Sequence, residues 1–192
     1  MHILYRLLFS EIDVFLRGWQ LPLYASSAVA GAILLLLAGL AYRFLLEDSR
    51  IPGLSIKPEK AAQSLAGGLL AGLVVILISY FWPGESSRSD LTILQAAVLV
   101  LLIPVVEELY YRQLMLGYLL KRMPSTKAMF WAMQAIVALC FAFSHDYFIA
   151  PVLLIPGLAF GLLFSRANVA GSILAHAAYN ALLLGGTYAM DS

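Results

Sequence analysis

Hydrophobic and polar positions along this chain alternate in long blocks instead of the short periods of a soluble fold. Apolar runs are separated by brief connections rich in charge, Pro, Gly and Ser. A helix needs roughly 20 apolar residues to cross a bilayer, and several runs reach that length. The pattern predicts an all-α, polytopic membrane helical bundle of about six spans, which cover residues 21–46, 61–82, 91–120, 128–144, 148–164 and 171–189.

The first twenty residues follow a different pattern. Leu4, Leu8, Ile12 and Phe15 recur at helical spacing, and charged side chains lie between them. Such a segment is typical of an amphipathic helix that lies in the membrane interface. We therefore divide the chain into an interfacial helix over residues 1–20 and a single transmembrane domain over 21–192.

Composition and charge support a membrane protein and narrow the partners. Hydrophobic residues make up 62% of the 192 positions and charged residues 12%, against roughly 45–50% apolar usage in soluble domains. The formal net charge of +1 gives no reason to expect nucleic acid as a partner. Basic residues gather in the connections after the first, third and fifth spans, which places those connections in the cytoplasm.

The third span carries charge where a membrane helix can least accommodate it. Glu107, Glu108 and Arg112 follow Pro104, where we expect the helix to kink. Each ionisable residue at a helix centre costs about 2.5–3.5 kcal/mol unless it is paired. Glu108 and Arg112 are four residues apart and can form an ion pair. Glu107 is displaced by about 100° around the helix, so it needs a partner from another helix, a water molecule or a proton.

Two histidines supply candidate partners. His145 ends the fourth span, and His176 lies within the sixth, with Asn180 four residues later on the same face. A single histidine in a membrane helix is more often a packing residue than a catalyst. Polar groups on three helices of an otherwise apolar region are a different matter, because each is costly to bury. Their presence predicts that the helices bring them together in one polar cavity.

These groups together suit the hydrolysis of an amide. A glutamate in a low-dielectric site is a stronger base than in water and can deprotonate a water molecule. His145 can hold that water or stabilise the base, while His176 and Asn180 can donate hydrogen bonds to a developing oxyanion. Neither the GxSxG pattern of serine hydrolases nor the HExxH pattern of zinc proteases occurs in the chain.

Three motifs resemble one known family. EELYYR (107–112) matches EExxxR, FAFSH (141–145) matches FxxxH, and HAAYN (176–180) matches HxxxN, in that order and on successive helices. This arrangement is similar to the CPBP family, which contains the CAAX endopeptidases and bacteriocin-processing enzymes and is also called the Abi family. The resemblance covers a catalytic core of about residues 94–184.

The resemblance implies an intramembrane glutamic endopeptidase. Glu107 would activate water with His145 as its partner, and His176 and Asn180 would stabilise the oxyanion. Glu108 and Arg112 would hold the geometry of the site or contact substrate, although a purely structural ion pair explains them equally well. The expected surroundings and substrates are the bilayer of a prokaryotic cytoplasmic (inner) membrane and membrane-anchored or hydrophobic peptides and proteins.

Metal dependence and the class of function each have a rival interpretation. One Glu and two His would also suit a catalytic zinc ion. We favour a mechanism without a metal or other cofactor, because the Asn180 amide is a good oxyanion donor and a poor zinc ligand. Two other functions use the same residues: a proton- or ion-coupled transporter, and a non-enzymatic membrane protein of the bacteriocin-immunity type.

Overall fold

The computed structural model describes residues 55–81, 92–145 and 150–190, together with scattered positions between 18 and 40. Within these residues all regular structure is helical, as the sequence predicted. The expected interfacial helix over 1–20 lies outside the described residues apart from position 18, and most of the expected first span lies outside them too.

Two long helices coincide with the predicted second and third spans. The first is α3, Pro58–Phe81, and the second runs from Ile93 to Arg122. The second helix is a chain of α-helical and π-helical turns: α4 (Ile93–Ala97), η1 (Val98–Leu102), α5 (Ile103–Glu108), η2 (Leu109–Leu116) and α6 (Gly117–Arg122). It begins with a capping box, in which the Thr92 hydroxyl accepts from the Gln95 amide and the Gln95 side chain accepts from the Thr92 amide.

The last long helical segment, α8 (Leu154–Met190), folds back on itself. Ala167 and Asn168 leave helical geometry, with φ of −139° and 59°. On a straight helix residues 160 and 176 would be about 24 Å apart, yet the Phe160 and His176 rings stack at 4.6 Å. Asn168 tolerates its positive φ, and its side-chain oxygen accepts from the Ala170 amide at 2.8 Å. The break therefore separates two arms, 154–166 and 169–190, which correspond to the predicted fifth and sixth spans.

The expected number of about six spans is not confirmed. In the described part of the chain three segments are long and apolar enough to cross a membrane: Pro58–Phe81, Ile93–Arg122 and Pro151–Gly186. Helix α7 (Lys127–Ala142), at the predicted fourth span, has 16 residues and falls short of the usual length. The first arm of α8, preceded by the 3₁₀ turn η3 (Ala150–Leu153), is shorter still.

Helix α3 packs directly on α8 because glycines let the two backbones approach. A Cβ at Gly68 would overlap the Ala175 carbonyl, and one at Gly72 would touch the Leu182 side chain. Gly157 fits against Ala138 of α7 in the same way. Both GxxxG motifs of the chain, at Gly68 and at Gly157, thus serve close helix packing.

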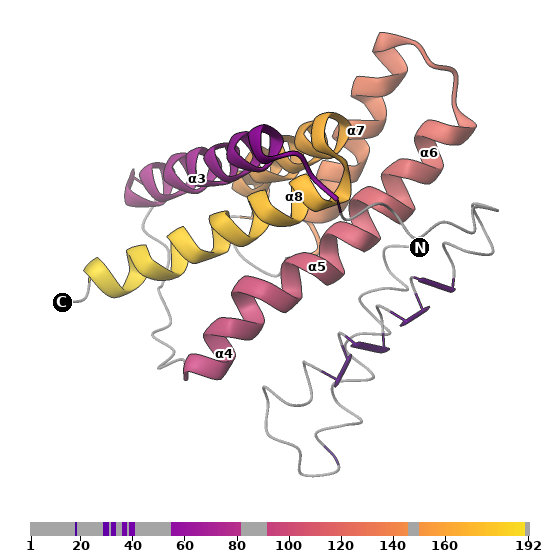
Figure 1. Cartoon of the computed structure of the whole chain (residues 1–192). Coiled ribbons are helices and arrows are strands. Elements are labelled where there is room, and N and C mark those ends of the chain that lie inside the picture. The colour runs from indigo at the N-terminus through magenta and orange to yellow at the C-terminus, as the bar shows by residue number, and fades with distance from the viewer. Residues whose placement is uncertain are drawn as a thin grey trace.

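Several helix ends lie toward one end of the bundle. Figure 1 shows the start of α3, the break in α8 and the α6–α7 turn lying toward the same end. The Asn168 side chain donates to the Ser55 carbonyl at 3.0 Å, which ties the break in α8 to the residues before α3. The cytoplasmic assignment of those connections stays a prediction.

Candidate active site

A π-helical turn comes directly before Pro104, where the sequence predicted a kink. The Ile103 amide donates to the Val98 carbonyl, five residues back. Pro104 has no amide hydrogen to donate. The Leu99 carbonyl therefore has no helical donor four or five residues ahead of it. Turns of this kind inside α-helices are frequent at functional sites.

The predicted ion pair on this helix is present and fully buried. Nε of Arg112 lies 3.1 Å from Oε2 of Glu108, and both side chains have no exposed surface. The Arg112 guanidinium also lies over the Phe141 ring, 5.4 Å from its centroid. Its two terminal nitrogens have no hydrogen-bond partner. Arg112 thus neutralises Glu108 through a single hydrogen bond at Nε.

His176 lies between the two glutamates and contacts both. Its Nδ1 is 3.0 Å from Oε1 of Glu108, and its Nε2 is 3.7 Å from Oε2 of Glu107. Because the Glu108 carboxylate is paired with Arg112, it accepts and Nδ1 of His176 carries the hydrogen. That bond turns Nε2 toward Glu107. Helix α8 and the third span therefore do bring their polar residues together, as predicted.

Glu107 differs from its buried neighbours in its exposure. Its side chain keeps 14% of its surface accessible, against 3% for His176 and none for Glu108. Its contact with His176 is also longer than a hydrogen bond, at 3.7 Å. Of these three side chains, Glu107 keeps the largest accessible fraction, and no short bond engages it.

His145 joins the cluster through Phe141. Its Nδ1 lies 2.9 Å from the Phe141 carbonyl, which can only accept, so Nδ1 is the donor and neutral His145 presents an unprotonated Nε2. The Phe141 ring meets the His145 ring edge-on at 5.0 Å and the His176 ring at 5.7 Å. The imidazole beside Glu107 among the described contacts is that of His176, whereas the resemblance pairs Glu107 with His145.

Asn180 is held to the π-helical turn. Its Nδ2 donates to the Leu99 carbonyl at 2.8 Å. One hydrogen of the amide group is therefore engaged, and the second, together with the side-chain oxygen, is left for other contacts. Asn180 lies one helical turn beyond His176 on the same face of α8.

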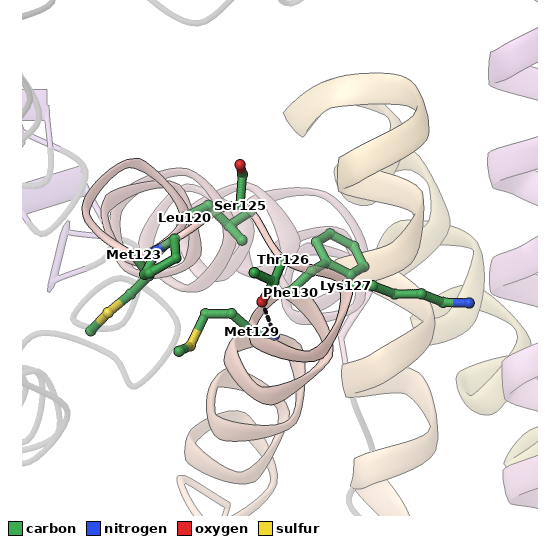
Figure 2. Close-up of a pocket in the computed structure, with 8 residues that line it drawn as sticks. Leu120, Met123, Ser125, Thr126, Lys127, Met129 and Phe130 are labelled. Carbon is green, nitrogen blue, oxygen red and sulfur yellow. Dashed lines mark hydrogen bonds between the residues drawn. The ribbon is translucent and has the colours of Figure 1, made fainter.

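A cavity of about 340 Å³ lies elsewhere, at the α6–α7 turn. Figure 2 shows Met123 and Met129 on one side of it and Lys127 extending to the other. At 1.5 Å per residue this turn is roughly 20 Å along the helix from Glu107, and its lining contains no carboxylate or imidazole. It is separate from the polar cluster.

A comparison with known families now adds to this geometry. Residues 89–182 match the family model described as type II CAAX prenyl endopeptidase, Rce1-like. This segment, 94 of the 192 residues, is similar to the Rce1-like family. The match confirms the resemblance to CAAX proteases that the three motifs indicated, and it supports a peptidase and an integral membrane protein. No curated protein and no solved structure matches the chain.

Zinc binding by Glu107, His145 and His176 was the alternative considered from the sequence. In the described residues no group of three His, Cys, Asp or Glu side chains lies close enough to hold a metal ion. Nδ1 of His145 donates to its own helix and Nδ1 of His176 donates to Glu108, an arrangement that zinc-binding histidines also use. The metal-free mechanism therefore stays a prediction.

Phe141 of the FAFSH motif and two residues that sequence analysis missed, Phe160 and Ser172, lie around the imidazoles. Phe160 stacks on His176 with the rings 22° apart, and Phe141 contacts both histidines. Ser172 is fully buried and donates to the Val169 carbonyl at 3.0 Å. Ser172 precedes His176 by four residues, so helical spacing could have indicated it. Nothing in the sequence marks Phe160.

Proposed function

We propose that this protein is an intramembrane glutamic endopeptidase that hydrolyses a peptide bond in a membrane-attached protein or peptide. The match of residues 89–182 to the Rce1-like family model supports a peptidase. The observation that carries the catalytic assignment is the position of Glu107. It is the partly exposed carboxylate of the cluster, and an imidazole nitrogen faces it at 3.7 Å.

Glu107 acts in this proposal as the general base. It takes a proton from a water molecule as the water oxygen forms a bond to the scissile carbonyl carbon. The resulting tetrahedral intermediate expels the amine as the C–N bond breaks. The proton held by Glu107 passes to the leaving nitrogen, so the carboxylate is regenerated. Glu108 is a poor candidate for this step, because Arg112 and His176 already occupy its two oxygens.

His176 and Asn180 form the proposed oxyanion site. As an imidazolium, His176 donates Nδ1–H to Glu108 and presents Nε2–H on the side of Glu107, where the oxyanion would develop. The second amide hydrogen of Asn180 supplies another donor. Glu108 and Arg112 act as positioning residues: the Glu108 bond fixes the ring orientation of His176, and the Arg112 bond fixes Glu108.

His145 is proposed to hold the attacking water. Its Nδ1 is engaged with the Phe141 carbonyl, so neutral His145 offers Nε2 as an acceptor. An acceptor at that position can bind one hydrogen of a water molecule while Glu107 removes the other. His145→Ala is therefore expected to lower the cleavage rate without disturbing the Glu108–His176 contact.

No metal ion takes part in the proposed reaction. The direct test is proteolysis by protein that has been stripped of metal and assayed with a chelator present. We expect the cleavage rate to be unchanged. Activity that is lost on stripping and restored by zinc alone would contradict the metal-free mechanism.

The proposed substrates lie in or on the bilayer of a prokaryotic cytoplasmic membrane and are cut near a terminus or a hydrophobic anchor. Mass spectrometry of membrane proteins from cells with the wild-type protein, and from cells with Glu107→Gln, should reveal a new terminus only with the wild type. A pH-gradient response in liposomes without peptide products would instead indicate a transporter. Protection against a bacteriocin that persists in Glu107→Gln would indicate an immunity protein.

A further inference from the structure

The contact between Asn180 and Leu99 joins two features that have no obvious link in the sequence. The π-helical turn sends the Ile103 amide to Val98, and Pro104 supplies no amide hydrogen. The Leu99 carbonyl thus loses both helical donors, four and five residues ahead. The Asn180 amide, 81 residues away along the chain, donates to this carbonyl at 2.8 Å.

A carbonyl left without a donor inside a membrane helix costs several kilocalories per mole by general estimates, so such groups are almost always satisfied. Asn180 provides that donor from α8. Its bond therefore stabilises the irregular turn on which Glu107 and Glu108 are carried, only three and four residues beyond Pro104.

The same bond also completes a two-point attachment between the helices. His176 contacts Glu107 and Glu108, and Asn180, one turn further on the same face of α8, contacts Leu99. Helix α8 also packs on η1, α5 and η2 along this stretch. The contact at Leu99 adds a second polar attachment one turn from His176, and we expect it to constrain the distance between Glu107 and Nε2 of His176.

We propose that Asn180 is a positioning residue for Glu107, because its amide replaces the backbone donor that Pro104 lacks. This role is additional to the oxyanion contact under Proposed function and uses the other hydrogen of the same amide group. It deepens that proposal, since the group positioned is the proposed base. The stabilising role of the bond between Asn180 and the Leu99 carbonyl can, however, be tested without any catalytic activity.

The test is a double-mutant cycle of Asn180→Leu and Pro104→Ala in the full chain. Asn180→Leu alone should lower Tm by several degrees, because the Leu99 carbonyl loses its donor. In the Pro104→Ala background, where residue 104 regains an amide hydrogen, the same substitution should lower Tm much less. If the Tm loss of the double variant equals the sum of the Tm losses of the two single variants, the proposal is wrong.

A matched control and a conservative variant guard against general destabilisation. Gln134 is another buried amide that donates to a backbone carbonyl, that of Gly161 at 3.1 Å, but it lies on α7. Gln134→Leu should lower Tm by the same amount in the wild type and in the Pro104→Ala background. Asn180→Gln, which keeps the amide, should retain part of the Tm lost in Asn180→Leu. Loss of Tm in Asn180→Gln equal to that in Asn180→Leu would count against the amide as the essential group.

The rate of peptide cleavage distinguishes a positioning role from a purely structural one, because a purely structural role would leave kcat of the folded enzyme unchanged. Asn180→Leu should reduce kcat by a smaller factor in the Pro104→Ala background than in the wild type, because only the oxyanion contact is then lost. An equal reduction in both backgrounds would show that Asn180 does not position Glu107. If no variant, including the wild type, cleaves any peptide, the peptidase proposal fails while the Tm cycle still decides the structural coupling.

Discussion

Charged side chains are largely buried and paired in the middle of the helix from Ile93 to Arg122, and they are exposed at its end. In the middle every charged group has a partner: Arg112 with Glu108, and His176 with both glutamates. At the end, the cations of the α6–α7 turn, Arg122 and Lys127, are exposed. The sequence contains no Asp or Glu between Glu108 and Asp146 to neutralise them.

The two regions differ because charges in the middle of the helix are largely shielded from water, whereas those at its end are hydrated. A buried charge without a partner is costly, so the chain uses one helix to supply Glu108 and Arg112 and another to supply His176. An exposed cation at a helix end is hydrated and needs no partner, and a basic excess there helps to set orientation in the membrane. Side chains in the middle are therefore expected to control stability and activity, and those at the turn neither.

The largest effect is expected from separating the buried pair. Arg112→Met leaves the Glu108 carboxylate buried beside only His176, and breaking such a pair costs about 3–5 kcal/mol. We expect the variant to lose most of its folded yield and to show a large fall in Tm by thermal denaturation in detergent. Adding Glu108→Gln removes the unpaired charge and should recover much of that loss. A single Arg112→Met variant as stable as the wild type would refute the pairing argument.

A smaller effect is expected where α3 packs on α8. Gly68→Ala would force a methyl group against the Ala175 carbonyl, and overpacking of this kind typically costs about 1–3 kcal/mol. Gly185→Ala is the matched control, because nothing lies within 4 Å of a Cβ there. Thermal denaturation of the two variants should separate them clearly, and equal Tm values would mean that the close approach of α3 and α8 is not important.

The smallest effect is expected at the turn. Replacing Arg122 and Lys127 together by Gln removes two exposed cations and the contact of the Arg122 guanidinium with the Tyr118 ring, 5.5 Å from its centroid. Surface changes of this type usually alter stability by no more than about 0.5 kcal/mol, and cleavage should continue at the wild-type rate. A loss comparable to that of Arg112→Met would erase the distinction between the two regions.

The sequence predicted the helical class, the second and third spans and the buried pair, because each rests on local spacing. Apolar runs report length directly, and residues four apart on a helix must share a face. It also predicted that Glu107 would find a partner on another helix. The break at Ala167 and Asn168 lies between the segments predicted as the fifth and sixth spans, but their crossing of the membrane as two spans is not confirmed.

The contact between His176 and Glu107 was beyond sequence reasoning. The resemblance pairs His145 with Glu107, which stays a prediction, and the structure adds His176 at 3.7 Å from Glu107. Which ring reaches a carboxylate depends on how deeply each helix sits, and spacing along one helix says nothing about that. The contact between Asn180 and Leu99 was invisible for the same reason, although Pro104 signalled that some carbonyl would lack its donor.

The central claim is that two adjacent carboxylates have different tasks, with Glu107 as the base and Glu108 as a positioning residue. The most direct measurement compares the cleavage rates of Glu107→Gln and Glu108→Gln, each as folded full-length protein on one membrane-attached peptide. Loss of a general base typically costs about 10²–10⁴-fold, so Glu107→Gln should fall by at least that much and Glu108→Gln by clearly less. Cleavage by Glu107→Gln at the wild-type rate would contradict the account.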